Sequence, residues 1–365
     1  MLKRVTFTII FLCLILTVNG QNHYSKIIRQ AEQKIINKQL DSAIFYYKQA
    51  FKKHEYPFTR DVLAAACITT HTNDTNTLYS LLEVLLNRGM SLNELNYFVK
   101  KNPDDKRLNL FKNEYLKYNV RYLNSLDSGL YNMYEALDIE EQISNQNRIL
   151  SISQKLKDLD NISNKYLNLL NKYGFPTENK IGIGCFSAIE YLNKKSEIKK
   201  DERLISIKNF KGSKSSKYIF WHRYSNLRFI NTQYYRVGNG FLWHTNLALL
   251  PKLDSVLLSY VHKNKMSSTF FGSVRERGGW DYGLSWESKA NQKYNFSITK
   301  IIKSPEANKI NLNRMELGLR SLEMDLDLFN AIVKLEKINP KHYFKSNTKK
   351  ANNLLFLSLF VQMIP

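Results

Sequence analysis

Glycine and proline are scarce in this chain, with 14 glycines and 7 prolines among 365 residues. Average usage would supply about twice as many. Turn-rich β sandwiches, collagen-like rods and long flexible linkers depend on these residues, so their scarcity argues against all three and favours helices. Hydrophobic residues form 43% of the chain and charged residues 24%, which is close to globular proteins and excludes a wholly disordered chain.

Long hydrophobic runs are missing after residue 20, so we expect no internal membrane span. Before that point a basic pair, Lys3 and Arg4, precedes a short apolar stretch that ends at Gly20. A basic start, a short apolar centre and small residues before the cut are typical of a secretory signal peptide. We predict a signal peptide at 1–20 and a mature protein in the periplasm, outside the cell or at its surface. An uncleaved membrane anchor is the alternative.

Cysteine is also rare: Cys13 lies in the predicted signal peptide, and only Cys67 and Cys185 follow it. One disulfide could form in an oxidising compartment, but we expect no disulfide and two separately buried thiols. The sequence contains no P-loop, no His-Glu-x-x-His zinc motif, no Gly-x-Ser-x-Gly elbow and no paired Cys-x-x-Cys. Gly182-Ile183-Gly184 lacks the preceding buried strand that a dinucleotide-binding loop needs. We therefore predict neither a metal nor a cofactor.

Positive charge is concentrated in the second half of the chain. Residues 21–150 hold 17 Lys and Arg against 15 Asp and Glu, whereas residues 151–365 hold 35 against 17. A surplus of this size favours polyanionic partners such as acidic glycans or lipid headgroups, and export argues against nucleic acid. The alternative is an ordinary solvated surface, because Lys, Asn and Ile are abundant throughout the chain.

Small residues mark a pair of helices near the start of the mature chain. Apolar residues recur there at helical spacing in two short stretches, and the alanines allow the two helices to approach closely. The spacing of Ala31, Ala43, Tyr47 and Ala50 is similar to that of a tetratricopeptide repeat. Further helical patterns follow, so we predict stacked helical hairpins over 21–118. Their curved surface would hold a peptide or a neighbouring domain.

Glycines mark the ends of predicted helices. Gly89 follows a leucine stripe of helical period, and Gly174 precedes Phe175-Pro176, where proline bars continuation. We predict long helices between residue 120 and Gly174, with Leu156, Leu159, Leu167 and Leu170 on one apolar seam, and further helices at 247–262 and 314–337. The stretches 218–221 and 229–237 favour short strands, with buried helix as the alternative. The predicted fold is mainly α: helical hairpins are followed by a basic helical domain with a small irregular or β insertion at 119–330. A helical tail at 331–365 then docks on the core.

Two apolar-Trp-His triplets hold the histidines best suited to chemistry, namely His222 and His244. Packing against an indole lowers the pKa of an imidazole by desolvation, which suits a general base. A dense polar stretch begins at Arg275, where paired guanidiniums could clamp a carboxylate or phosphate. The candidate catalytic residues are His244, Arg277 and Asp281, and the candidate ligand-binding residues are His222, Arg275 and Tyr282. The structural alternatives are a core histidine bonded to a backbone carbonyl, and a loop fixed by an ion pair of Arg277.

Several short motifs taken in order resemble a bacterial domain family of unknown function. The matching motifs are Gly174-Phe175-Pro176-Thr177, Trp243-His244, Glu276-Arg277, Tyr282-Gly283, Pro305-Glu306 and Arg314-Met315-Glu316-Leu317-Gly318-Leu319. They keep the order and approximate spacing of the family over residues 120–325. Trp243 stands where the family has Gln, and Glu276 where it has Asp. The resemblance implies domain limits and carries no activity.

Three functions follow from these patterns. The leading interpretation is an exported protein-binding or scaffold module whose N-terminal hairpins contact another protein. The first alternative is an enzyme of unassigned reaction, with His244 as the base and Arg277 and Tyr282 orienting an anionic substrate. The second is a polyanion or envelope-surface binder that uses the basic half.

Overall fold

The computed structural model describes residues 23–181, 251–275 and 302–337, apart from 91, 128, 131, 132, 135, 138, 139, 142, 143 and 145–150. Every regular element in these residues is a helix, which confirms the predicted mainly α fold. The predicted strands at 218–221 and 229–237 lie outside the described residues. Among the described helices, none combines the length and the apolar content that crossing a bilayer requires.

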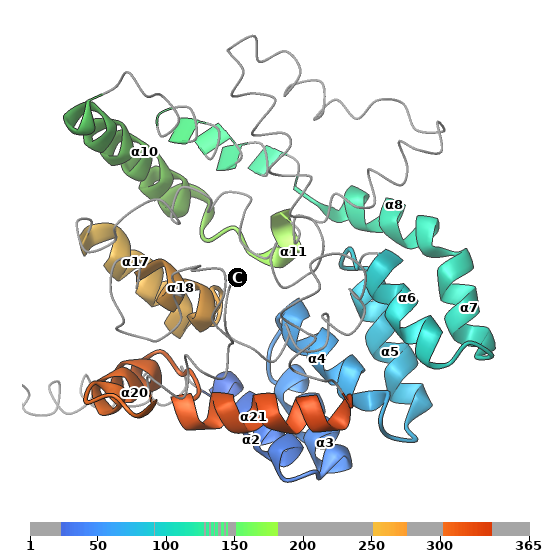
Figure 1. The fold of residues 1–365 in the computed structure, drawn as a ribbon. Helices are drawn as coiled ribbons and strands as arrows, with labels where there is room; N and C mark the ends of the chain where they lie inside the picture. Colours follow the sequence, from blue (N-terminus) through green and yellow to red (C-terminus); the bar gives the residue numbers. More distant parts are fainter. Residues whose placement is uncertain are drawn as a thin grey trace, which may run out of the picture.

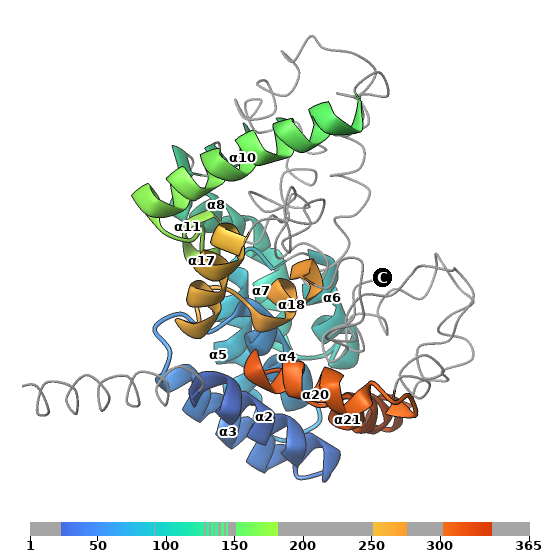
Figure 2. The ribbon, with the colours of Figure 1, turned by 90° about the vertical axis from the view of Figure 1, so that its left-hand side faces the viewer.

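Within the described residues, seven helices come first in the chain (Figure 1). They are α2 (His23–Ile36), α3 (Leu40–Lys52), α4 (Thr59–Thr69), α5 (Thr75–Leu86), α6 (Leu92–Lys101), α7 (Lys106–Asn113) and α8 (Tyr115–Ser125). The later described helices are α10 (Ile152–Tyr173), α11 (Glu178–Ile181), α17 (Pro251–His262), α18 (Ser268–Arg275), α20 (Ala307–Glu316) and α21 (Leu322–Leu335). In two perpendicular views, α17 and α18 lie between α10 and the pair α2 and α3 (Figures 1 and 2).

The hairpin of α2 and α3 packs through small residues. Ala31, Ala43 and Ala50 have no exposed surface, and Tyr47 is 1% exposed. Because alanine adds only one methyl group to the interface, the two helix backbones can lie close together at normal packing density. The predicted helical hairpin is confirmed, whereas its kinship with tetratricopeptide repeats stays a prediction.

Two predicted glycine positions do end helices. Gly89 follows α5 with φ of 86°, and the Met90 N–H donates to the Leu85 carbonyl at 3.0 Å. Gly174 follows α10 with φ of 75°. A left-handed backbone satisfies the last carbonyls of a helix and is easiest for glycine, so both helices end where the sequence predicts.

Two details of the predicted helices are wrong. The helix predicted at 314–337 is interrupted after α20, where Gly318 has φ of 72° and the Leu319 N–H donates to the Arg314 carbonyl at 2.8 Å. Ser321 then caps α21 by accepting from the Met324 N–H at 3.2 Å. On α10, Leu156 was expected in the buried seam but is 51% exposed.

The described apolar side chains form two main clusters. The first joins α2 to α8 and also contains three residues of α21, namely Leu328, Phe329 and Ile332. The second joins α10, α17 and α18 with the turn after α20. Helix α21 lies against α2, so a late segment completes the N-terminal core (Figure 1). The predicted division into domains near residue 118 stays a prediction.

Candidate functional site

Most of the predicted site residues lie outside the described residues: His222, His244, Arg277, Asp281 and Tyr282. The structure places Arg275, which is the last residue of α18. Its Nη2 lies 3.2 Å from Asp254 Oδ2 on α17, and its guanidinium lies 5.8 Å from the Phe271 ring. Burial raises the pKa of Asp254, while Arg275 acts to lower it. In the described part of the chain, Arg275 therefore joins α18 to α17.

The buried thiol of Cys67 offers no reactive centre. Cys67 is on α4, is free, and has no exposed surface. Burial raises the pKa of its thiol, so the nucleophilic thiolate is disfavoured. Cys185 lies outside the described residues. Among the residues that the structure places, no group of three His, Cys, Asp or Glu side chains is arranged to hold a metal ion.

A polar pocket of about 80 Å³ lies where four segments meet, and we call it the junction pocket. Its walls are α2, the start of α4, the turn between α17 and α18, and the turn between α20 and α21. The residues that line it are Tyr24, Ser25, Ile28, Arg29, Glu32, Phe58, Arg60, Asp61, Ala64, Asn264, Met266, Ser267, Ser268, Thr269, Gly318, Leu319 and Arg320. Three arginines thus converge on one small space.

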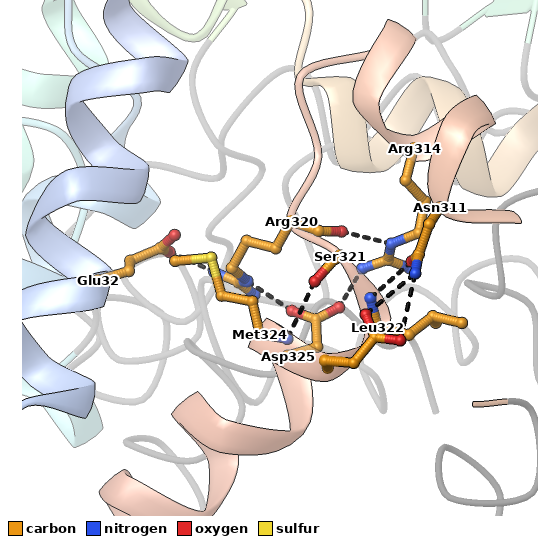
Figure 3. A network of polar contacts seen from close by, with 9 residues as sticks. Glu32, Asn311, Arg314, Arg320, Ser321, Leu322, Met324 and Asp325 are labelled. Carbon is orange, nitrogen blue, oxygen red and sulfur yellow. Dashed lines mark hydrogen bonds and ion pairs between the residues drawn. The ribbon is translucent and has the colours of Figure 1, made fainter. Parts of the chain in front are cut away.

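One wall of the junction pocket is a buried ion-pair network (Figure 3). Arg320 donates to Glu32 and, through Nε, to Asp325 Oδ1 at 2.5 Å. Arg314 donates to the other oxygen of Asp325, and its Nε donates to the Arg320 carbonyl at 2.5 Å. All four side chains are at most 8% exposed. Each carboxylate of this network therefore faces a guanidinium, as buried charges require.

The lining also contains a second pair of polar groups. The Tyr24 hydroxyl donates to Asp61 Oδ2 at 2.7 Å. Burial raises the pKa of Asp61, and the hydrogen bond from Tyr24 and the charge of Arg60 act to lower it. Burial also lowers the pKa of Arg29; Glu32 opposes that shift, and Arg320 adds to it. Burial therefore disfavours the charged form of Arg29, and a bound anion would stabilise that charge.

Neutral hydrogen-bonding groups complete the lining. Ser25, Ser267, Ser268 and Thr269 supply hydroxyls. Helix α18 begins at Ser268, and Ser267 Oγ accepts from the Phe270 N–H at 3.5 Å. The N-terminal end of a helix carries a partial positive charge, so this wall adds to the arginines rather than opposing them.

The charges of the pocket do not cancel. Three arginines and two carboxylates line it. The network behind the wall adds one arginine and one carboxylate, Arg314 and Asp325, so one positive charge remains. Pockets for whole drug-sized ligands measure about 300–1,000 Å³. A pocket of about 80 Å³ instead suits one charged group at the end of a larger molecule.

Sequence reasoning missed this site because its residues come from four distant segments. One signal was present: the Arg-x-x-Leu-Gly-Leu motif begins at Arg314, which is fully buried, and ends one residue before Arg320. A buried guanidinium needs paired partners, so this arginine indicates a polar cluster once its burial is known. Comparison with protein-family models, with curated proteins and with solved structures finds no match to this chain.

Proposed function

We propose that the protein is an exported binding module that takes an acidic side chain of a partner protein in the junction pocket. The observation that supports it is the convergence of Arg29, Arg60 and Arg320 with only two lining carboxylates. Guanidinium groups bind carboxylates through two parallel hydrogen bonds, and such charge-assisted bonds are stronger than neutral ones.

The net charge favours a carboxylate over a phosphate group. One carboxylate brings one negative charge, which balances the surplus of one positive charge in the pocket and the network behind it. A phosphate group with two negative charges would leave a net negative charge beside Glu32 and Asp61. Like charges at close range in a partly buried site are unfavourable, so the singly charged group fits better.

The N-terminal hairpin contributes directly to this surface. Tyr24, Ser25 and Arg29 are on α2 and line the pocket. A partner that places an acidic side chain there would also lie along α2. This keeps the protein-binding role of the N-terminal hairpins that we expect from the sequence, and it gives the contact a defined chemistry.

A peptide-binding experiment tests the proposal. The probe is a short peptide of alternating glutamate and serine with both ends blocked, and its control replaces each glutamate by glutamine. We expect the glutamate peptide to bind, and Arg29→Gln or Arg60→Gln to weaken binding by about tenfold or more, since a hydrogen bond to a charged group contributes about 1.5–3 kcal/mol. Arg121→Gln is the matched control, because Arg121 is exposed on α8 and does not line the pocket.

Calorimetric titration measures each affinity. Equal binding of the glutamine peptide, or an unchanged affinity in both pocket variants, would overturn the proposal. Absence of glutamate-peptide binding to the wild-type protein would do the same.

A further inference from the structure

Glu178 joins two parts of the chain that are far apart in sequence. It is the first residue of α11, just after the Phe175-Pro176 turn. Its Oε2 accepts two hydrogen bonds from Thr59: one from the backbone N–H at 2.9 Å and one from Oγ1 at 2.7 Å. The two residues are 119 positions apart, and Glu178 is 9% exposed. Glu178 therefore caps the start of α4 from outside that helix.

The second oxygen of this carboxyl group is unusual. Glu178 Oε1 is buried and has no hydrogen-bond partner among the described residues. An ionised carboxylate in such a place lacks part of the solvation that it has in water, which disfavours the charged form. Burial raises the pKa of Glu178 to about 7, although the two hydrogen bonds from Thr59 act to lower it.

The other charged groups near Glu178 act in both directions. Arg88, which follows α5, acts to lower the pKa of Glu178, and Asp61 on α4 acts to raise it. The negative charge of Glu178 also acts to raise the pKa of Tyr24 on α2 and of Tyr56 before α4. Two carboxylates, Glu178 and Asp61, thus flank the first turn of α4.

Thr59 links this carboxyl to the junction pocket. Its sequence neighbours Phe58 and Arg60 both line the pocket, and so does Asp61. A change in the hydrogen bonds that hold Thr59 would therefore change the position of the α4 residues that line the pocket. Ionisation of Glu178 would do so in two ways: it places a second negative charge behind Asp61, and it leaves a buried charge with an unpaired oxygen that favours opening to water.

We propose that Glu178 is a pH-operated latch, which holds the α4 wall of the junction pocket while its carboxyl group is protonated and weakens anion binding once that group ionises. This inference rests on the proposed function, since the ligand that it regulates is the acidic group bound in that pocket. Binding and protonation are then linked in both directions, so that the bound anion promotes protonation of Glu178.

The affinity of the glutamate–serine peptide at about pH 6 and at about pH 8 tests the latch, because peptide glutamates with pKa near ~4.3 stay ionised throughout. We expect the wild-type affinity to fall by about threefold to tenfold over this interval, tenfold being the effect of a one-unit shift in pKa on binding. Glu178→Gln, which keeps the shape and stays neutral, should bind equally well at both values. If Glu178→Gln keeps the wild-type pH response, the titrating group lies elsewhere, as at Asp61, and the proposal is overturned.

A second variant separates a latch from a merely structural contact. Thr59→Val removes the hydroxyl donor and keeps the backbone donor and the shape of the side chain. Because the hydroxyl hydrogen bond acts to lower the pKa of Glu178, its loss should move the midpoint of the pH response to higher pH. An unchanged midpoint in a folded Thr59→Val protein would contradict the latch.

Hydrogen exchange gives a measurement that needs no ligand. The protection factor of the Thr59 amide should fall as the pH rises through about 7 in the wild-type protein, and stay constant in Glu178→Gln. Peptide binding that is independent of pH would reject the proposed role of Glu178 and would not contradict the proposed function. Loss of Thr59 protection without peptide binding at any pH would instead sink the proposed function.

Discussion

Arg320 is paired with Glu32, which lies 288 residues earlier in the chain. The same guanidinium donates to Asp325 in the first turn of α21, so it joins α2 to the turn before α21. Both ends of this connection are buried, at 2% and 8% of side-chain surface. The ion pair therefore contributes to the contact between α2 and α21 as well as to the wall of the junction pocket.

Arg320→Met tests the importance of this connection for stability. The substitution leaves the carboxylates of Glu32 and Asp325 buried with one guanidinium fewer, and loss of one partner of a buried pair costs about 3–5 kcal/mol. We expect the free energy of unfolding in urea to fall by that amount. The control is Lys117→Met, which removes an exposed pair with Glu114 and should change stability by less than about 0.5 kcal/mol. Equal effects of the two substitutions would show that the network does not stabilise the fold.

Ala43→Leu tests the close approach of α2 and α3. Ala43 has no exposed surface, so the larger side chain must displace neighbours, and overpacking of this kind costs about 1–3 kcal/mol. Thermal unfolding should therefore occur at a lower temperature. Phe45→Leu on the same helix is the control, because Phe45 is 55% exposed and its truncation should change stability by about 0.5 kcal/mol or less. If Ala43→Leu unfolded at the wild-type temperature, the two helices could move apart without a loss of stability.

Gly89→Ala tests the end of α5. A Cβ atom at Gly89 would lie 2.5 Å from Tyr122 Cε1, and φ of 86° is itself unfavourable for alanine. We expect a loss of about 2–4 kcal/mol in the free energy of unfolding, which combines backbone strain with displacement of a buried ring. The control is Gly129→Ala, for which we expect the opposite effect. A Cβ atom at Gly129 would lie in ordinary contact, 3.5 Å from Asp127 Oδ1, within a helical segment. This substitution should therefore raise the free energy of unfolding by about 0.4–1 kcal/mol. Chemical denaturation measures both variants, and a change of the same sign in their free energies of unfolding would reject the prediction.

The features that were predicted correctly from sequence are local ones. The burial of Ala31, Ala43 and Ala50 and the helix ends at Gly89 and Gly174 follow from the spacing and the backbone preferences of neighbouring residues. The same reasoning placed Leu156 in a seam because it fits the helical period. Leu156 is nevertheless 51% exposed. Periodicity shows which residues share a face of a helix, but it does not show how far along that helix a neighbour extends.

The junction pocket could not be predicted in this way. Glu32, Asp61 and Arg320 meet only after α2, α4 and the turn before α21 have packed, and no local pattern records that meeting. The break at Gly318 was also missed, because the apolar pattern continues through it into α21. Of the six candidate site residues, the structure describes Arg275 alone, and it shows an ion pair with Asp254. An ion pair was the structural alternative expected for this arginine-rich stretch, but it was expected for Arg277 and not for Arg275.

The ion pairs of Glu336 should make the attachment of α21 sensitive to acid. Glu336, just after α21, lies 2.5 Å from both His71 Nε2 and Lys101 Nζ, and accepts from the Tyr97 hydroxyl at 3.2 Å. Burial acts to raise the pKa of Glu336, but the hydrogen bonds from His71 and Lys101 outweigh it and hold the pKa below its ordinary value. A carboxyl group with a lowered pKa stabilises the folded state above its unfolded pKa of about 4.3, and that stability is lost as the pH falls through the folded pKa. We expect Glu336→Gln to destabilise the protein near neutral pH and to have little effect in acid.

Urea unfolding of the wild-type protein and Glu336→Gln at several pH values between about 3 and 7 measures this difference. The gap between the two proteins should narrow steadily toward acid. Glu114→Gln is the control, because Glu114 forms an exposed pair with Lys117, and its stability should follow the wild-type curve throughout. A gap for Glu336→Gln that stays constant across the range would mean that packing, and not the charge of this carboxylate, holds the end of α21 against α4 and α6.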